Sequence, residues 1–262
     1  MTEVLSRTLG GAVVLVTGAG GGIGSAMCTA LVDAGAQVAG SDVGERPAGL
    51  TIDAWFRHDV TSAQDWHRVV AEIGSRFGRL DCLINNAGIC PVESIEKTSL
   101  EQLRRVSSVN VESIFLGLQA ALPLLRQSGE KRAGGSSVVN ISSTAGIRGV
   151  AFCAAYCASK AAVTLLTKSA AKEFAALRYP IRVNSIHPGA VETAMMSSIV
   201  ARFVEQGLSG SEAGQKAAFT NSTPLGRMGQ PAEIAGAVVF LCSQAASFMT
   251  GAEIVIDGAG TA

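Results

Sequence analysis

Residues 12–24 read AVVLVTGAGGGIG, a short β-branched apolar run that meets a cluster of glycines. From Ile23 to Ala34 the apolar residues follow helical spacing, so the stretch predicts a strand, a tight loop and a helix. Glycines let the backbone approach a pyrophosphate, and the amides at the start of a helix face such an anion. The stretch is therefore a candidate dinucleotide-binding loop. Its expected contact residues are Gly18, Gly22, Ile23 and Gly24.

Taken alone, this loop could equally be a simple tight turn, because a literal G-x-G-x-x-G is absent. Its context favours a nucleotide. Asp42 follows a second apolar run at residues 37–41, where a dinucleotide fold places the residue that accepts hydrogen bonds from the adenosine ribose. A carboxylate there would repel a 2′-phosphate, and residues 18–24 contain no lysine or arginine. We therefore expect NAD rather than NADP as the cofactor.

Apolar runs and helical patterns alternate from Val13 to Ile256, and no linker, charge block or repeat divides the chain. Further strands are predicted at about residues 54–58, 80–85, 137–142, 181–186 and 253–256. Helical patterns lie near residues 62–77, 100–126, 154–177 and 231–243. Strands separated by helices imply a parallel sheet covered on both faces. We expect an α/β protein in which residues 1–262 form a single Rossmann-type domain around a doubly wound parallel sheet.

Composition argues against several kinds of partner. The 262 residues hold 21 basic and 21 acidic side chains, so no net charge would attract nucleic acid or an anionic membrane. The amino terminus lacks the features of a signal peptide, and we expect a cytoplasmic protein. Six cysteines form no C-x-x-C pair and lie near no histidine cluster, so neither disulfides nor a metal site are expected. Cys153 and Cys157 are interpreted as small packing residues.

Tyr156 and Lys160 place a phenol and an ammonium four residues apart, on one face of the helix predicted from about Ala154. At about 4 Å and an effective dielectric near 20, their attraction would be about 4 kcal/mol before desolvation opposes it. Such an attraction would lower the tyrosine pKa from about 10 toward 7, where a phenol exchanges protons at physiological pH. On its own, Tyr-x-x-x-Lys is more typical of a solvated helix surface.

Further motifs accompany this pair, in order along the chain. They are Thr17 to Gly24, Asp59, Asn85-Asn86-Ala87-Gly88, Asn110, Ser143, Tyr156-x-x-x-Lys160 and Pro188-Gly-Ala-Val-Glu-Thr193. Together they resemble the short-chain dehydrogenase/reductase family, from about Gly11 to Gly258. Ser143 lies thirteen residues before Tyr156, the spacing usual in that family. Any single motif could arise by chance, but all of them in order make coincidence implausible.

The resemblance implies a catalytic role for four residues. Tyr156 would be the general acid/base, and Ser143 would hydrogen-bond the substrate oxygen and hold it toward the phenol. Lys160 would hold the nicotinamide ribose and lower the tyrosine pKa, while Asn110 would anchor a water that links Lys160 to solvent. Ser143 and Tyr156 would therefore also bind the substrate.

The resemblance also extends the cofactor site beyond the glycine loop. Asp59 and the Val60 backbone would bind the adenine, and Asn86 and Gly88 would form the floor under the adenosine ribose. Structural alternatives are a helix-start cap at Asp59 and an ordinary turn at Asn86. The remaining cofactor contacts would be Tyr156 and Lys160, and Val191 and Thr193 at the nicotinamide carboxamide.

Residues 193–225 are rich in methionine, serine, alanine and phenylalanine, and they resemble the family's substrate-binding lid. Flexible methionines and few charges favour an apolar or weakly polar ligand, although helices packed on the body would have the same composition. The resemblance implies a homodimer or homotetramer, formed through the helices near residues 100–126 and 154–177 and through the carboxyl-terminal segment. His187 is interpreted as a packing residue, because the proton-transfer role is already filled.

The sequence thus predicts an oxidoreductase that transfers a hydride between NAD(H) and a secondary alcohol or ketone whose identity it does not reveal. One alternative is a 3-oxoacyl carrier-protein reductase, because the layout, including residues 226–231, is similar to that group. Such reductases usually prefer NADP and bind an acidic carrier protein, so Asp42 and the neutral charge argue against it. A second alternative is a catalytically silent dinucleotide-binding regulator. The intact set Asn110, Ser143, Tyr156 and Lys160 argues against that function.

Overall fold

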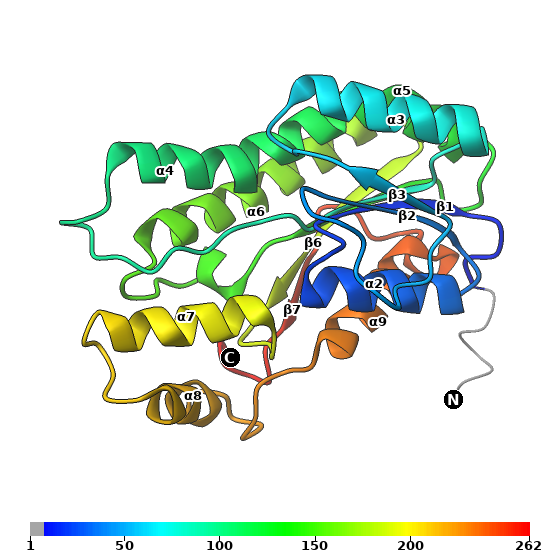
Figure 1. Cartoon of the computed structure of the whole chain (residues 1–262). Helices are drawn as coiled ribbons and strands as arrows, with labels where there is room; N and C mark the ends of the chain where they lie inside the picture. Colours follow the sequence, from blue (N-terminus) through cyan, green and yellow to red (C-terminus); the bar gives the residue numbers. More distant parts are fainter. Residues whose placement is uncertain (1–7) are drawn as a thin grey trace.

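A seven-stranded parallel sheet forms the centre of the computed structural model, which describes residues 8–262 (Figure 1). The strands are β1 (Val13–Thr17), β2 (Gln37–Asp42), β3 (Ala54–Arg57), β4 (Cys82–Asn85), β5 (Ser136–Ile141), β6 (Ile181–Pro188) and β7 (Glu253–Ile256). Their spatial order is β3-β2-β1-β4-β5-β6-β7, and every neighbouring pair is parallel. The doubly wound sheet expected from the sequence is confirmed. Residues 1–7, in which we expect no signal peptide, lie outside the described part of the chain.

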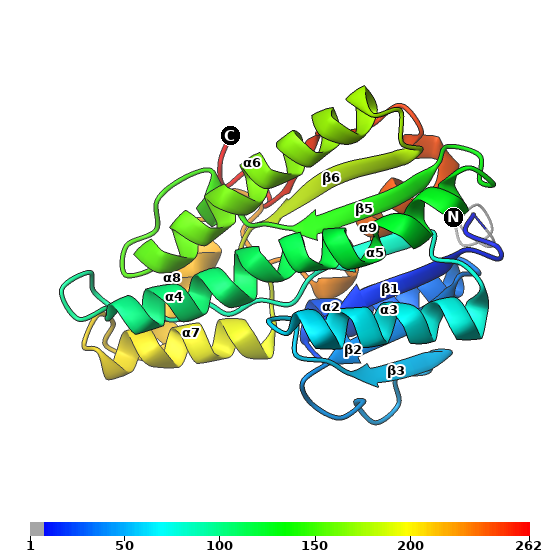
Figure 2. The same ribbon diagram turned by 90° about the horizontal axis from the view of Figure 1, so that it is seen from above.

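Helices cover both faces of this sheet (Figures 1 and 2). On one face lie α2 (Gly22–Asp33) and α9 (Pro231–Cys242), and on the other lie α3 (Ala63–Phe77), α5 (Ser113–Gly129) and α6 (Ala154–Ala176). Side chains of β1 alternate between the two cores: Val14 and Val16 pack toward α2 and α9, while Val13 and Leu15 pack toward the other helices. Because both faces are buried, the strand reads as an unbroken apolar run.

The helix predicted over residues 100–126 is present as one continuous run, Leu100–Gly129, but it contains a π-helical turn that the sequence did not predict. It consists of α4 (Leu100–Ser107), a π-helical turn η1 (Ser108–Glu112) and α5. A π turn accommodates an extra residue within a helix, and such turns are common at functional sites. Here the turn carries Asn110, which is 1% exposed and directs its amide into the protein rather than along the helix surface.

Among the described helices, the combined run Leu100–Gly129 is long and apolar enough to cross a membrane by length and composition alone, with a mean hydropathy of 1.3. Its apolar window is 44% buried inside the protein. Ile114, Leu118 and Leu125 belong to the core under the sheet. The core therefore accounts for part of the apolar character of this helix, while Leu103 and Phe115 are exposed.

Two further helices, α7 (Ala194–Glu205) and α8 (Glu212–Asn221), lie beyond the carboxyl ends of the strands, toward which the strand arrows point in Figure 2. Each begins at a hydroxyl side chain. The Thr193 hydroxyl accepts from the Met196 amide at 3.1 Å, and the Ser211 hydroxyl accepts from the Gly214 amide at 3.1 Å. The segment expected as a lid is therefore a pair of capped helices at the end of the sheet where ligands bind in such folds.

The glycine loop allows α2 to start in contact with β1. Gly18 has φ +62°, and a Cβ there would lie 2.8 Å from the Ala87 Cα. A Cβ on Gly24 would lie 2.1 Å from the Gly18 carbonyl oxygen. Both positions therefore require glycine, the first for its backbone conformation and for space, the second for space alone.

We expect Gly24→Ala to lower the free energy of unfolding by about 1–3 kcal/mol or more, because the backbone must move to make room for the methyl group. Gly236→Ala is the matched control: this glycine lies in α9 with open space around its Cβ position. That change should stabilise by about 0.5–1 kcal/mol, since alanine favours the helix. Urea unfolding of both variants measures the difference, and equal stability of the two would contradict the close contact.

Candidate active site

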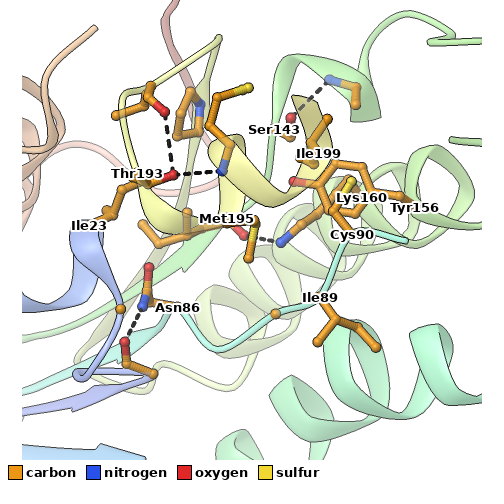
Figure 3. Close-up of a pocket in the computed structure, with 18 of the residues that line it drawn as sticks. Ile23, Asn86, Ile89, Cys90, Ser143, Tyr156, Lys160, Thr193, Met195 and Ile199 are labelled. Atoms are coloured by element: carbon orange, nitrogen blue, oxygen red, sulfur yellow. Dashed lines mark hydrogen bonds between the residues drawn. The ribbon is translucent and has the colours of Figure 1, made fainter. Parts of the chain in front are cut away.

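A cavity of about 450 Å³ lies at the carboxyl ends of the strands. It brings together fourteen of the residues that the sequence singled out: Gly18, Gly22, Ile23, Gly24, Asp42, Asp59, Val60, Asn86, Gly88, Ser143, Tyr156, Lys160, Val191 and Thr193. Asn110 lies behind the cavity wall. Figure 3 shows Ile23, Asn86 and Thr193 at one side of the cavity and Ser143, Tyr156 and Lys160 at the other.

Asp42 holds the glycine loop in place. One carboxylate oxygen accepts from the Gly20 amide at 3.0 Å, and the other accepts from the Gly44 amide at 3.2 Å. A Cβ on Gly20 would lie 3.0 Å from the same carboxylate, so the loop has room for Asp42 only because it carries no side chain there. The carboxylate lies at the end of β2 and lines the cavity, as the sequence predicted.

Asp59 and Val60 form the next part of the wall. An Asp59 carboxylate oxygen accepts from the Thr61 amide at 2.9 Å and from the Thr61 hydroxyl at 2.7 Å. The hydrogen bond from the Thr61 amide, and after it the one from the Thr61 hydroxyl, hold the pKa of Asp59 below its usual value. Ser62 rather than Asp59 caps α3, so the alternative of a helix-start cap is wrong. The Val60 carbonyl accepts from the Trp66 indole at 2.9 Å, which fixes the backbone on this side.

Asn86 joins the loops that follow β1 and β4. Its side-chain amide donates to the carbonyls of Thr17 and Gly18, each at 3.0 Å, and its backbone amide donates to the Thr17 hydroxyl at 3.0 Å. These bonds cross from one strand end to its neighbour at the point where the strand order reverses. Asn86 is therefore a structural link as well as part of the cavity wall.

Asn110 is occupied by protein groups. Its amide nitrogen donates to the Ile89 carbonyl at 3.0 Å and to the Ser159 hydroxyl at 2.9 Å, and its oxygen accepts from the Ile89 amide at 2.8 Å. The amide thus fixes the loop after β4 against α6. These contacts do not test the expected role of anchoring a water, which stays a prediction. A Cβ on Gly88 would lie 3.3 Å from this amide oxygen and 3.5 Å from the Lys160 ammonium, so glycine makes room for both.

Lys160, Tyr156 and Ser143 form a cluster at the inner end of the cavity (Figure 3). The Lys160 ammonium donates to the Ile141 carbonyl at 2.8 Å and lies 5.6 Å from the centre of the Tyr156 ring. Ser143 hydrogen-bonds the Tyr156 side chain, and its hydroxyl also accepts from the Ala145 amide at 3.1 Å. The phenol and the serine hydroxyl can thus meet the same oxygen atom of a ligand.

The expected lowering of the tyrosine pKa toward 7 is not found. Burial raises the pKa of Tyr156 well above its ordinary value, the neighbouring Cys90 adds to the rise, and the bond with Ser143 opposes it. Burial also lowers the pKa of Lys160 to about 8. The physical reason is that both groups leave water, while the ammonium donates to Ile141 and faces the phenol ring.

His187, which the sequence analysis set aside, supports Ser143 from behind. It is fully buried, with one ring nitrogen 2.8 Å from the Ser185 hydroxyl and the other 3.2 Å from the Ser143 carbonyl. Burial lowers the pKa of His187, so the ring is held neutral near pH 7. These contacts agree with its interpretation as a packing residue.

The outer half of the cavity is apolar, and sequence reasoning found only part of it. Its wall combines the expected lid side chains Met195, Met196, Ile199, Phe203 and Phe219 with Ile89, Cys90, Val150 and Cys153. Ring contacts at 6.2 Å join Phe203 to Phe219 and to Phe152, which ties both lid helices to the body. Arg105 and Arg148 also line the cavity, and no motif in the sequence indicated them.

These residues fit a nicotinamide dinucleotide. The glycine loop leaves a backbone cradle at the start of α2, where a pyrophosphate binds in such folds. His58 lines the cavity next to Asp59, and its buried Nε2 has no hydrogen-bond partner among the described residues. Within residues 8–262 there is no group of three or more His, Cys, Asp or Glu side chains that could hold a metal ion.

Comparisons with known proteins extend along the whole chain. A family profile described as enoyl-(acyl carrier protein) reductase matches residues 18–261. A cyclopentanol dehydrogenase from a Comamonas species is 40% identical over 95% of this chain and 97% of its own. An NADP-dependent (R)-specific alcohol dehydrogenase from Lentilactobacillus kefiri is 35% identical over 98% of this chain and all of its own.

A short-chain type dehydrogenase/reductase from Mycobacterium marinum superposes with a TM-score of 0.85, at 33% identity, over all of this chain and 99% of that one. The sequence similarity, the matched fold and the clustered motif residues agree with one another. The chain belongs to the short-chain dehydrogenase/reductase family.

Proposed function

We propose that this protein is an NAD-dependent dehydrogenase that interconverts an alicyclic secondary alcohol and its ketone. The observation that carries the proposal is the position of the Tyr156 and Ser143 hydroxyls. They lie where the glycine-lined half of the cavity, which fits a dinucleotide, meets the apolar half, which fits a hydrocarbon ring. A substrate oxygen bound between these hydroxyls would place its carbon at that junction.

The side chains divide the proton chemistry between them. When bound, NAD supplies the hydride acceptor for the alcohol carbon, and NADH supplies the hydride for the ketone. Ser143 holds the substrate oxygen, and Tyr156 takes its proton in oxidation and returns it in reduction. Because the pKa of Tyr156 is raised, the phenol is protonated at neutral pH and suited to ketone reduction, whereas oxidation needs the phenolate and is favoured at higher pH.

The preference for NAD rests on Asp42. Its carboxylate is fixed by the Gly20 and Gly44 amides at the end of β2, where a ribose would bind. Ribose hydroxyls can donate to it, whereas a 2′-phosphate would meet a like charge. The NADP-dependent relative shows that the family includes the other preference.

The substrate class rests on the apolar wall. The cavity wall includes Met195, Ile199 and Phe203 from α7 and Ile89 and Cys90 from the loop after β4. A compact hydrocarbon ring would bury its surface there, and the single polar end would be met by Ser143 and Tyr156. The cyclopentanol dehydrogenase similar to this chain acts on a ligand of that kind.

We also propose a cytoplasmic homodimer or homotetramer. All six cysteines are free thiols, as a reducing compartment would keep them. Leu103, Phe115 and Leu165 are exposed on the helices expected to pair, and Val255 is exposed on β7. Pairing these faces would bury apolar side chains that one subunit leaves in water.

An acyl carrier-protein substrate is the competing function, since the matching family profile bears such a description. It would require the site to accept an acyl chain on a phosphopantetheine arm. The neutral overall charge gives an acidic carrier protein no counterpart. Turnover of acyl thioesters but not of cyclic alcohols would decide for this alternative.

The first test combines substrate and cofactor. We expect cyclopentanol and cyclohexanol to reduce NAD with a larger kcat/KM than NADP, and Asp42→Ser to narrow the ratio by about tenfold or more, because the repulsive carboxylate is gone. Asp33→Ser, which removes an exposed carboxylate at the end of α2, should leave the ratio unchanged. A wild-type enzyme that prefers NADP would overturn the assignment of the ribose site.

Tyr156→Phe should lower kcat by about 10²–10⁴-fold while NADH still binds, because the ring keeps its packing and only the proton donor is lost. Tyr179→Phe is the matched control, since that ring packs on Phe174 away from the cavity. Steady-state kinetics and NADH fluorescence titration separate turnover from binding. Retained turnover in the Tyr156 variant would remove the acid/base role.

Lys160 should make stability depend on pH. Its pKa is about 8 in the folded protein against 10.5 in the unfolded chain, so the charged form costs the fold about 3 kcal/mol below pH 8. Between pH 8 and 10.5 the folded state loses the proton first, and this cost disappears. The wild type should therefore gain stability relative to Lys160→Met as pH rises from 7 to 10.

Denaturant unfolding of both proteins across that range provides the measurement. Lys172→Met, at an exposed position of the same helix, shows what the loss of a lysine does outside the site. A stability difference between wild type and Lys160→Met that is constant with pH would contradict the buried ammonium.

A further inference from the structure

Two free thiols lie in the cavity wall, and the proposed reaction uses neither. Cys90 is on the loop after β4, and Cys153 is the N-cap residue of α6. Both line the cavity together with Tyr156 and Lys160, and their side chains hydrogen-bond each other. Figure 3 shows Cys90 beside Tyr156 and Lys160. Both thiols thus border the cavity, with Cys90 half-buried and Cys153 5% exposed.

The two sulfur atoms have different environments. Cys153 stands at the start of a helix of 23 residues, where the helix dipole favours a thiolate. The hydrogen bond from Cys90 lowers the pKa of Cys153, whereas the same bond raises that of Cys90. Cys153 is therefore the nucleophile of the pair, and Cys90 keeps its proton.

We propose that Cys90 and Cys153 form a site of oxidative modification, at which a hydroperoxide converts the two thiols into a disulfide across the substrate half of the cavity. The Cys153 thiolate attacks hydrogen peroxide, the O–O bond breaks, and the products are a sulfenic acid and, after protonation, water. The Cys90 sulfur then attacks the sulfenic sulfur and releases a second water. Two thiols lose two electrons and two protons, and the peroxide is reduced to two water molecules.

A Cys90–Cys153 disulfide would change the site because it joins two segments that carry or support reacting groups. A disulfide brings the sulfurs to about 2.05 Å and ties the loop after β4 to the first turn of α6. That loop carries Gly88, which makes room for Lys160, and Ile89, which is held by Asn110. Tyr156 lies in the first turn of α6. Oxidation should therefore displace the groups on both sides of the substrate oxygen.

A second thiol pair in the same chain provides an internal comparison. Cys82 in β4 and Cys242 at the end of α9 are fully buried, and the Arg132 guanidinium donates to the Cys82 sulfur at 3.2 Å. This arginine also favours a thiolate, so contact with the cavity is what separates the two pairs. The inner pair should stay reduced at peroxide doses that oxidise the cavity pair.

The test is peptide mapping of the whole protein after treatment with hydrogen peroxide. We expect a Cys90–Cys153 disulfide, which needs no assumption about the dehydrogenase function, and loss of at least about tenfold in turnover that dithiothreitol restores. Cys90→Ser should stop at a Cys153 sulfenic acid that dimedone traps, and Cys153→Ser should form no disulfide. Each variant is compared with its own untreated sample.

Cys157→Ser is the matched control, since that thiol lies one turn further along α6 and bonds the Val150 backbone. It should behave like the wild type. The proposal is overturned if a Cys82–Cys242 disulfide forms at a lower peroxide dose than the Cys90–Cys153 disulfide. It is also overturned if Cys90 and Cys153 stay reduced while the exposed Met195 is oxidised. A mapped disulfide without any substrate turnover before treatment would refute the dehydrogenase function and leave the modification site standing.

Discussion

Three backbone segments meet where Gly18 and Gly24 lack side chains. The first turn of α2 lies against the Gly18 carbonyl, and Gly18 lies against Ala87 on the loop after β4. The hydrogen bonds of Asn86 to Thr17 and Gly18 then fix that loop. Since the loop runs on through Gly88 to Cys90, one contact between backbones sets both the phosphate end of the cavity and the wall beside the tyrosine.

The reacting groups are held by backbone carbonyls and by side chains that do not react. Ile141 on β5 accepts from Lys160, and His187 on β6 contacts the Ser143 backbone. Asn110 fixes the loop after β4 from a π turn. Each support comes from a different element, so the positions of the reacting groups depend on how β5, β6 and the π turn pack together. The cost is the burial of an ammonium and a phenol, and it appears in their opposite pKa shifts.

The sheet was predictable because strands buried on both faces leave unbroken apolar runs, and every predicted strand is present within about two residues. The π turn was not, because Asn110 is placed by tertiary contacts that helical periodicity does not reveal. The starts of α7 and α8 could have been predicted, because Thr193 and Ser211 are typical N-cap residues. The segment was interpreted from its composition instead, which does not locate helix starts.

Residues that directly follow strands could be placed at the site from the topology alone. Arg148 and Cys153 could not, because they lie on a loop and at a helix start whose positions do not follow from those of the strands. The predicted pKa of Tyr156 was wrong because the Tyr-x-x-x-Lys spacing provides a distance. It gives no information about burial or about the Ile141 carbonyl that accepts a hydrogen bond from Lys160.

The helices over the outer half of the cavity contribute little to the core. α7 buries one side chain, Val200, and α8 buries none. Apart from the ring contacts of Phe203 and Phe219, substitutions at the cavity-lining positions of these helices should therefore change the shape of the cavity more than the core. Substrate range can then change through these two helices while selection on folding acts elsewhere.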